Sequence, residues 1–268
     1  MAAVSTDRLF YPAWAIVIAL ALFFLAPEAH TFATNVYEDM AYAVDPSASR
    51  AFAYGERHFD ATNPSEYDLD RAEYFFTLAA KKDPSTPYLY HELARISFLR
   101  GDYKQALARI DFQIMLHGDS EPNSYYVRGL IEGYMRDYGD AITDYTHFLL
   151  FDPNDWAAIN DDAWVLLKAG RFQEAADLTT KGLKIYPENP WLLNSNATAL
   201  YELGLYQPAL AAAEKAEAAV ATVTDSEWSH AYPGNDPTIA GEGVASFRQA
   251  VADNVHTIQL ALATSTVQ

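Results

Sequence analysis

The chain has 268 residues, of which 50% are hydrophobic and 14% aromatic, so it holds enough apolar material for a folded core. Its 18 basic and 36 acidic residues give a formal net charge of -18, which disfavours binding to the phosphate backbone of a nucleic acid. The absence of cysteine excludes disulfides, zinc–thiolate sites and thiol nucleophiles.

An uncharged apolar segment runs from Leu9 to Ala26, within an N-terminal region of residues 1–27. As a helix with about 1.5 Å rise per residue it would measure about 27 Å, close to the ~30 Å hydrocarbon core of a bilayer. The pattern predicts a retained transmembrane anchor, and thus a membrane partner. A cleaved signal peptide, which would release a secreted protein, and a core helix of a soluble protein are the alternatives.

The charges beside this segment predict its orientation. Arg8 precedes it, and no lysine or arginine occurs between Pro27 and Ser49. The positive-inside rule therefore predicts a single-pass membrane protein with a cytoplasmic N-terminus and the rest of the chain outside the cytoplasm. Residues 28–52 are expected to form a linker that is partly helical, because Asp45-Pro46 interrupts a helical pattern.

A period of about 34 residues dominates the segment 53–223. Buried-type alanines recur at Ala72, Ala106, Ala141, Ala175 and Ala209. A second small-residue column holds Ala94, Gly129, Ala163 and Ala197, with Asp60 as the misfit. Glycines precede the alanines at Gly101, Gly170 and Gly204, and prolines follow them at Pro84, Pro153 and Pro187.

These columns resemble the tetratricopeptide repeat (TPR), in which each repeat is a pair of antiparallel helices. The resemblance implies an all-α, right-handed α-α solenoid of about five TPR-like helical hairpins. In this register the repeats cover residues 53–86, 87–121, 122–155, 156–189 and 190–223. The glycine would end the first helix of a pair in a left-handed conformation, and the proline would end the second.

Two departures from the family pattern carry structural expectations. Asn63-Pro64-Ser65 falls where the first helix of repeat one should still run, so that helix is expected to be short or irregular. The large apolar residue before the small crossing residue is Leu93 in repeat two, and it is replaced by Arg128, Asp162 and Asn196 in the later repeats. Either these polar groups find hydrogen bonds inside the protein or their helices rotate to expose them.

Residues 224–268 are predicted to form a loop and a C-terminal capping helix. A turn cluster lies between His230 and Pro237, and apolar residues follow at helical spacing over 238–263. Solenoids need such a terminal element with one apolar and one wet face. A helix that binds a partner is the alternative for this segment.

In proteins that resemble this family, the first helices line a concave groove, and reading the groove positions gives a candidate partner-binding set. That set is rich in tyrosine, tryptophan and asparagine, which supply rigid contact area and paired donors and acceptors. It comprises Tyr88, His91, Arg95, Tyr126, Tyr134, Asn160, Trp164, Trp191, Asn194 and Tyr201. Asn160 and Asn194 occupy equivalent positions and could form a ladder along a peptide backbone. The alternative is that these aromatic residues pack between the repeats.

The function expected from this pattern is that of a membrane-anchored scaffold or adaptor that binds a peptide or a partner helix in its groove. The alternative is a structural or assembly protein that self-associates, as a homo-oligomer, through its repeats or its C-terminal helix. No enzymatic motif is present: His91-Glu92 starts like a helical zinc motif, but Arg95 stands where the second histidine must be. We therefore expect no catalytic residues, no metal and no cofactor.

Overall fold

The computed structural model describes residues 27–231 and 236–265, and in these ranges every regular element is helical. The prediction of an all-α fold is confirmed. The α-helices are α2 (Pro27–Val44), α3 (Ala48–His58), α4 (Leu69–Lys82), α5 (Leu89–Leu99), α6 (Tyr103–His117), α7 (Asn123–Met135), α8 (Tyr138–Phe148), α9 (Trp156–Lys168), α10 (Phe172–Ile185), α11 (Pro190–Glu202), α12 (Tyr206–Val220), α13 (Asp225–Ala231) and α14 (Ala240–Ser265). Two short 3-10 turns, η1 (Gly118–Ser120) and η2 (Pro237–Ile239), complete them.

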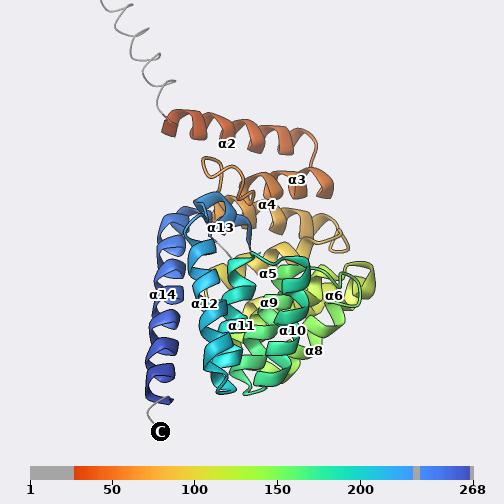
Figure 1. The fold of residues 1–268 in the computed structure, drawn as a ribbon. Helices are drawn as coiled ribbons and strands as arrows, with labels where there is room; N and C mark the ends of the chain where they lie inside the picture. Colours follow the sequence, from red (N-terminus) through yellow and green to blue (C-terminus); the bar gives the residue numbers. More distant parts are fainter. Residues whose placement is uncertain (1–26, 232–235, 266–268) are drawn as a thin grey trace, which may run out of the picture.

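Consecutive helices pack as hairpins, from α3 with α4 through to α11 with α12. The second helix of each hairpin also contacts the first helix of the next, so the hairpins stack in chain order. At one end of the stack α2 lies over α3, and at the other end α14 runs along α12 (Figure 1). The hydrophobic core therefore passes from hairpin to hairpin, as in repeat proteins.

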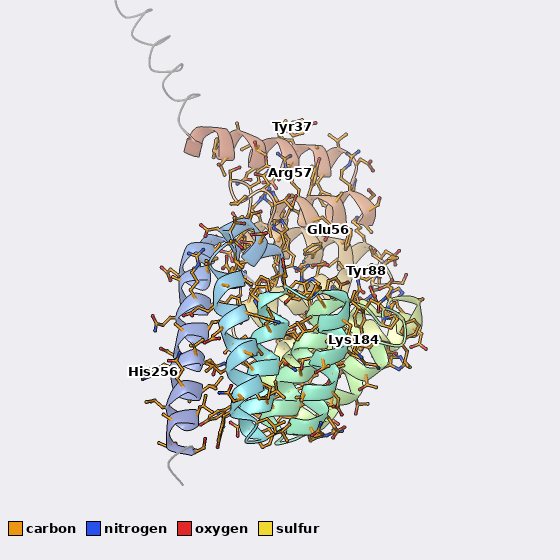
Figure 2. All side chains as sticks on the ribbon, in the orientation of Figure 1. Tyr37, Glu56, Arg57, Tyr88, Lys184 and His256 are labelled. Carbon is orange, nitrogen blue, oxygen red and sulfur yellow. The ribbon has the colours of Figure 1, made fainter. Side chains whose placement is uncertain are left out.

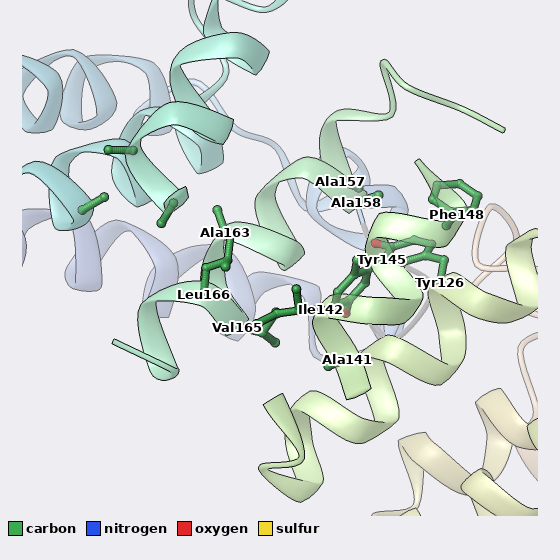
Figure 3. Packing of buried hydrophobic residues seen from close by; sticks show 13 residues of the cluster. Tyr126, Ala141, Ile142, Tyr145, Phe148, Ala157, Ala158, Ala163, Val165 and Leu166 are labelled. Atoms are coloured by element: carbon green, nitrogen blue, oxygen red, sulfur yellow. The ribbon is translucent and has the colours of Figure 1, made fainter. Parts of the chain in front are cut away.

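The small-residue columns explain this packing. All five alanines of the column from Ala72 to Ala209 are fully buried. In the third hairpin the crossing residue is Gly129, where an added Cβ would lie 3.2 Å from the carbonyl oxygen of Ala141. Aromatic side chains fill the space around these close approaches, with Tyr145 fully buried at the centre of the middle cluster (Figure 3). A larger side chain in the columns would separate the helices.

The turns inside the hairpins use a left-handed residue where the sequence predicted one. Gly101, Gly170 and Gly204 have φ angles of 75°, 73° and 74°. The third hairpin has no glycine at this point, and Arg136 takes the left-handed conformation instead, with φ of 71°. Glycine adopts this conformation without the steric penalty of a Cβ atom, so the third turn is the strained version of a shared geometry.

The polar residues that replace Leu93 lie inside the protein, and two of the three are satisfied there. The Nε atom of Arg128 donates to Asp144 at 2.5 Å, and the Nδ2 atom of Asn196 donates to the hydroxyl of Thr179 at 2.9 Å. Asp162 differs, because its buried Oδ1 atom has no hydrogen-bond partner among the described residues. Burial raises the pKa of Asp162 to about 7.

The region before the repeats is more ordered than a linker. Helix α2 occupies most of residues 28–52, and α3 starts at Ala48 rather than at residue 53. Buried Glu38 on α2 contacts the Nε2 atom of His58 at 2.7 Å and Arg71 at 3.3 Å, which ties α2 to the first hairpin. Helix α3 ends at His58, ahead of Asn63-Pro64, and a loop over residues 59–68 follows. With 11 residues it is as long as α5, so the first helix of this hairpin starts and ends earlier than predicted but is not shorter.

The prediction of a single-pass membrane protein is corrected. Across residues 27–231 and 236–265, no helix is both long and apolar enough to cross a bilayer. Helix α2 has the length, but it carries Glu38 and Asp39, and carboxylates are costly in hydrocarbon. The segment 9–26, to which the anchor was assigned, lies outside the described residues.

Candidate functional site

The first helices of hairpins two to five, α5, α7, α9 and α11, line two cavities on one side of the solenoid. We call this side the groove face. The central cavity has a volume of about 300 Å³ and is lined by Phe98, Leu130, Tyr134, Asn160, Asp161, Trp164, Trp191, Asn194, Ser195, Trp228 and Phe247. The N-terminal cavity has a volume of about 430 Å³, and its walls include Tyr88, His91, Glu92, Arg95, Tyr126, Asp155 and His230.

Aromatic rings form one wall of the central cavity. The ring of Tyr134 lies 5.6 Å from Trp164 and 4.9 Å from Phe98, measured between ring centroids. Trp164 itself rests on Gly133 of α7, where an added Cβ would come within 2.8 Å of the indole. Because Tyr134 is 51% exposed, this wall reaches the solvent. The open aromatic surface is therefore fixed in place by the packing of α7 against α9.

Asp161 places a carboxylate in the same cavity. It is 8% exposed, and its Oδ2 atom accepts a hydrogen bond from the Tyr126 hydroxyl at 3.0 Å. Burial raises the pKa of Asp161 to about 7; hydrogen bonds from Tyr126 and Asn160 oppose the rise, and the nearby Asp155 and Asp162 carboxylates add to it. In the described part of the chain, no cationic group lies near the Asp161 carboxylate.

The C-terminal segment covers the other wall of the central cavity. Phe247 on α14 stacks on Trp191 with ring centroids 5.1 Å apart, and Trp228 on α13 packs on Gly243. Helix α13 continues across the groove face towards the loop between α3 and α4 (Figure 1), and its His230 lines the N-terminal cavity. The chain's own C-terminal segment thus occupies the groove positions of the last hairpin.

The side-chain oxygens of Asn160 and Asn194, the predicted asparagine ladder, already accept hydrogen bonds from other residues of this chain. The Ser195 hydroxyl donates to Oδ1 of Asn160 at 2.7 Å. Asn254 on α14 donates through Nδ2 to Oδ1 of Asn194 and to the Thr198 hydroxyl, both at 2.9 Å. A peptide backbone that used these two amide oxygens would have to compete with Ser195 and Asn254.

The four predicted residues that line the N-terminal cavity already contact other residues of the protein or are buried. Tyr126 is 7% exposed and stacks on Phe148, while Arg95 pairs with Glu92 at 2.6 Å. Burial lowers the pKa of His91 to about 4, with a smaller opposing contribution from Glu92, so its imidazole is neutral at pH 7. The backbone N–H of Tyr88 donates to Glu121 at 3.0 Å. The lining of this cavity is therefore polar, and its polar groups mostly have hydrogen-bond or ion-pair partners within the protein.

The structure groups nine of the ten predicted groove residues into these two cavities. Tyr134, Asn160, Trp164, Trp191 and Asn194 line the central cavity, and Tyr88, His91, Arg95 and Tyr126 line the N-terminal one. Tyr201 lines neither, because it packs against Tyr206 and the buried face of α14. Sequence reasoning left out Trp228, Phe247 and Asn254, which lie beyond the repeats; the turn cluster before α14 was the one signal that the chain reverses there.

Within residues 27–231 and 236–265, no group of three or more His, Asp or Glu side chains is arranged to hold a metal ion. The polar groups of the groove face instead make hydrogen bonds and ion pairs with each other. The groove face therefore presents carboxylates, amides and aromatic rings.

Stacked helical hairpins with this alanine and glycine pattern define an α-solenoid of the TPR type. The comparison with solved structures agrees. A crystal structure of MamA protein superposes with a TM-score of 0.55 at 17% identity, covering 64% of this chain and 91% of that one. A crystal structure described as YrrB, a TPR protein with an unusual peptide-binding site, superposes with a TM-score of 0.56 at 16% identity, covering 68% and 91%.

At these identities the likeness concerns the fold. A second MamA crystal structure gives a TM-score of 0.53 at 18% identity, covering 59% of this chain and 92% of that one. No family model and no curated protein sequence matches the chain.

Proposed function

We propose that this protein is an interaction scaffold that binds an extended segment of a partner protein at the central cavity. The observation that supports this most directly is the aromatic wall on the groove face, which is made by exposed Tyr134 and partly buried Trp164. Large, rigid rings next to amide and carboxylate groups are typical of surfaces that recognise peptides, because the rings lose little conformational entropy on binding.

Helix α14 covers one end of the groove, and this restricts where a partner can bind. Trp191 already contacts Phe247, and Asn194 already accepts from Asn254, so an added ligand gains little there without displacing α14. Tyr134, Asp161 and Trp164 line the cavity from α7 and α9, and in the described part of the chain no ring contact or hydrogen bond joins them to α14. We therefore assign the partner to the central hairpins, α7 to α10.

A peptide library displayed on phage and selected on the full chain tests this function. We expect selected peptides to bind the unaltered chain, and Trp164→Ala to weaken their binding at least tenfold by removing a central aromatic contact. Phe151→Ala is the matched control, since Phe151 is a 45% exposed aromatic residue that lines neither cavity. Selection of no peptide, or equal losses in both variants, would contradict the proposal.

Self-association is the second candidate, and one feature of α2 favours it. Apolar side chains stand exposed four residues apart along this helix, with exposed fractions of 62% for Phe32, 40% for Val36, 65% for Met40 and 86% for Val44. Tyr37, 67% exposed, lies on the outer side of α2 next to them (Figure 2). A contiguous apolar stripe at the end of a solenoid is a surface on which a second copy could stack.

Light scattering on the full chain tests this second candidate. We expect a dimer whose dissociation constant rises at least tenfold in Met40→Glu, because the substitution places a charge within the stripe. Glu38 is unsuitable for such a test, since it is buried against His58 and its loss would disturb the fold. A monomeric mass at all concentrations would count against association through α2.

A further inference from the structure

The central cavity contains a buried carboxylate whose charge is not balanced. Most other buried acidic residues have a basic partner: Glu38 contacts Arg57, Arg71 and His58, Glu92 pairs with Arg95, and Asp144 pairs with Arg128. Asp161 is buried to the same degree, yet its hydrogen bonds come from Tyr126 and Asn160, and the charged groups near it are Asp155 and Asp162. A buried anion among other anions attracts a cation.

Its neighbour Asp162 shows that Asp161 is a special case. The two residues follow each other on α9, both are less than 9% exposed, and burial raises the pKa of both to about 7. Asp162 lines neither cavity and has Arg171, the residue just before α10, nearby. Successive helical residues point about 100° apart, so one carboxylate lies towards the core and the other towards the open cavity.

The walls of the cavity suit an organic cation. The rings of Tyr134 and Trp164 lie side by side at 5.6 Å in the same cavity as the Asp161 carboxylate, and Phe98 backs them. Aromatic faces attract ammonium and guanidinium groups through the ring quadrupole, most strongly where water is excluded. A volume of about 300 Å³ leaves room for such a head group.

We infer that the central cavity binds an organic cation, supplied by a lysine or arginine side chain of the partner segment, with Asp161 as its counter-ion and the Tyr134 and Trp164 rings as its walls. This inference rests on the proposed function, because it names the side chain by which the bound segment would be anchored. The bound cation would keep Asp161 ionised and replace the positive neighbour that the described residues do not supply. The chain's net charge of -18 favours the approach of such a basic segment.

The test uses small probes and the full chain. n-Butylammonium reproduces the end of a lysine side chain, tetramethylammonium represents a free quaternary ammonium ligand, and 1-pentanol is a neutral analogue of similar size. Binding is followed by the indole resonance of Trp164 in two-dimensional NMR. We expect saturable shifts with n-butylammonium and none with 1-pentanol at the same concentrations. Tighter binding of tetramethylammonium than of n-butylammonium would overturn the assignment to a partner's basic side chain.

Two adjacent substitutions make the result specific. Asp161→Asn should weaken n-butylammonium binding at least tenfold, and Asp162→Asn should weaken it far less, because the Asp162 carboxylate does not line the cavity. Equal binding of 1-pentanol, or unchanged binding in Asp161→Asn with thermal unfolding like that of the unaltered chain, would overturn the cation site. The phage-selected peptides distinguish failure of the cation site from failure of the scaffold function. Peptides that bind the unaltered chain and Asp161→Asn equally would overturn the cation site and leave the scaffold function standing.

Discussion

The groove face has two parts, built from the first helices of different hairpins, that differ in what covers them. In the last hairpin, Trp191 and Asn194 contact Phe247 and Asn254 of α14. In the central hairpins, Tyr134 and Trp164 line the opposite wall of the same central cavity, and the exposed ring of Tyr134 brings that wall to the solvent. A place on the groove face therefore does not by itself make a residue available to a partner, because a segment outside the repeats decides which positions stay open.

The largest expected effect compares an aromatic residue from each part. Trp191→Ala removes a half-buried indole packed on Trp156 and Phe247, and we expect it to lower the free energy of unfolding by about 3 kcal/mol. Tyr134→Ala, at an exposed position, should lower it by less than about 1 kcal/mol. Urea denaturation followed by circular dichroism measures both. Equal losses would mean that the two parts are covered alike.

The next effect concerns Asp162, whose carboxylate lies towards the core beneath the open cavity. Because the pKa of Asp162 rises to about 7 in the folded chain from an ordinary value of 3.8, its ionisation favours the unfolded state as the pH increases from about 4 to about 7. Above pH 7 the full cost applies. Asp162→Leu, which restores the residue type of Leu93, should stabilise the protein by roughly 2 kcal/mol at pH 8 and by much less at pH 4.

Thermal unfolding of Asp162→Leu at the two pH values checks this prediction. A stabilisation of the same size at pH 4 and pH 8 would show that the gain comes from apolar packing rather than from removal of the buried charge. Destabilisation at both values would mean that the carboxylate has a partner in the folded protein.

The smallest effect concerns the contact that holds α14 over the last hairpin. Asn254→Ala removes the donor to Asn194 and Thr198 and should cost about 1 kcal/mol. It should also speed hydrogen exchange along α14. His256→Ala is the control, since His256 lies exposed on the outer side of the same helix (Figure 2). The same exchange rates in both variants would assign the attachment of α14 to its apolar face alone.

The sequence predicted the hairpins well because their determinants are local and repeated. Each alanine, glycine and proline column acts within one hairpin, so a period of about 34 residues carries the information. The start of α3 at Ala48 was missed because the family pattern assigns the first helix a standard length. The left-handed conformation of Arg136 was also missed, since neighbouring repeats use glycine there.

The candidate site was only partly predictable for the opposite reason. The residues that face the groove follow from helical spacing, and nine of the ten line a cavity. Which of them stay open depends on Trp228, Phe247 and Asn254, which pack across the groove from more than 30 residues away in the sequence. The burial of Asp161 with no cationic neighbour among the described residues likewise depends on contact between α7 and α9, and no local pattern encodes it.

The most direct test of the open central groove uses a peptide selected on the full chain and the indole N–H resonances of its five tryptophans. The peptide should shift the Trp164 resonance, because that ring lines the open cavity. It should leave the Trp156 resonance unchanged, since the Trp156 ring packs against Trp191 and lines neither cavity. A selected peptide that moves Trp156 and leaves Trp164 in place would contradict the assignment of partner binding to the central hairpins.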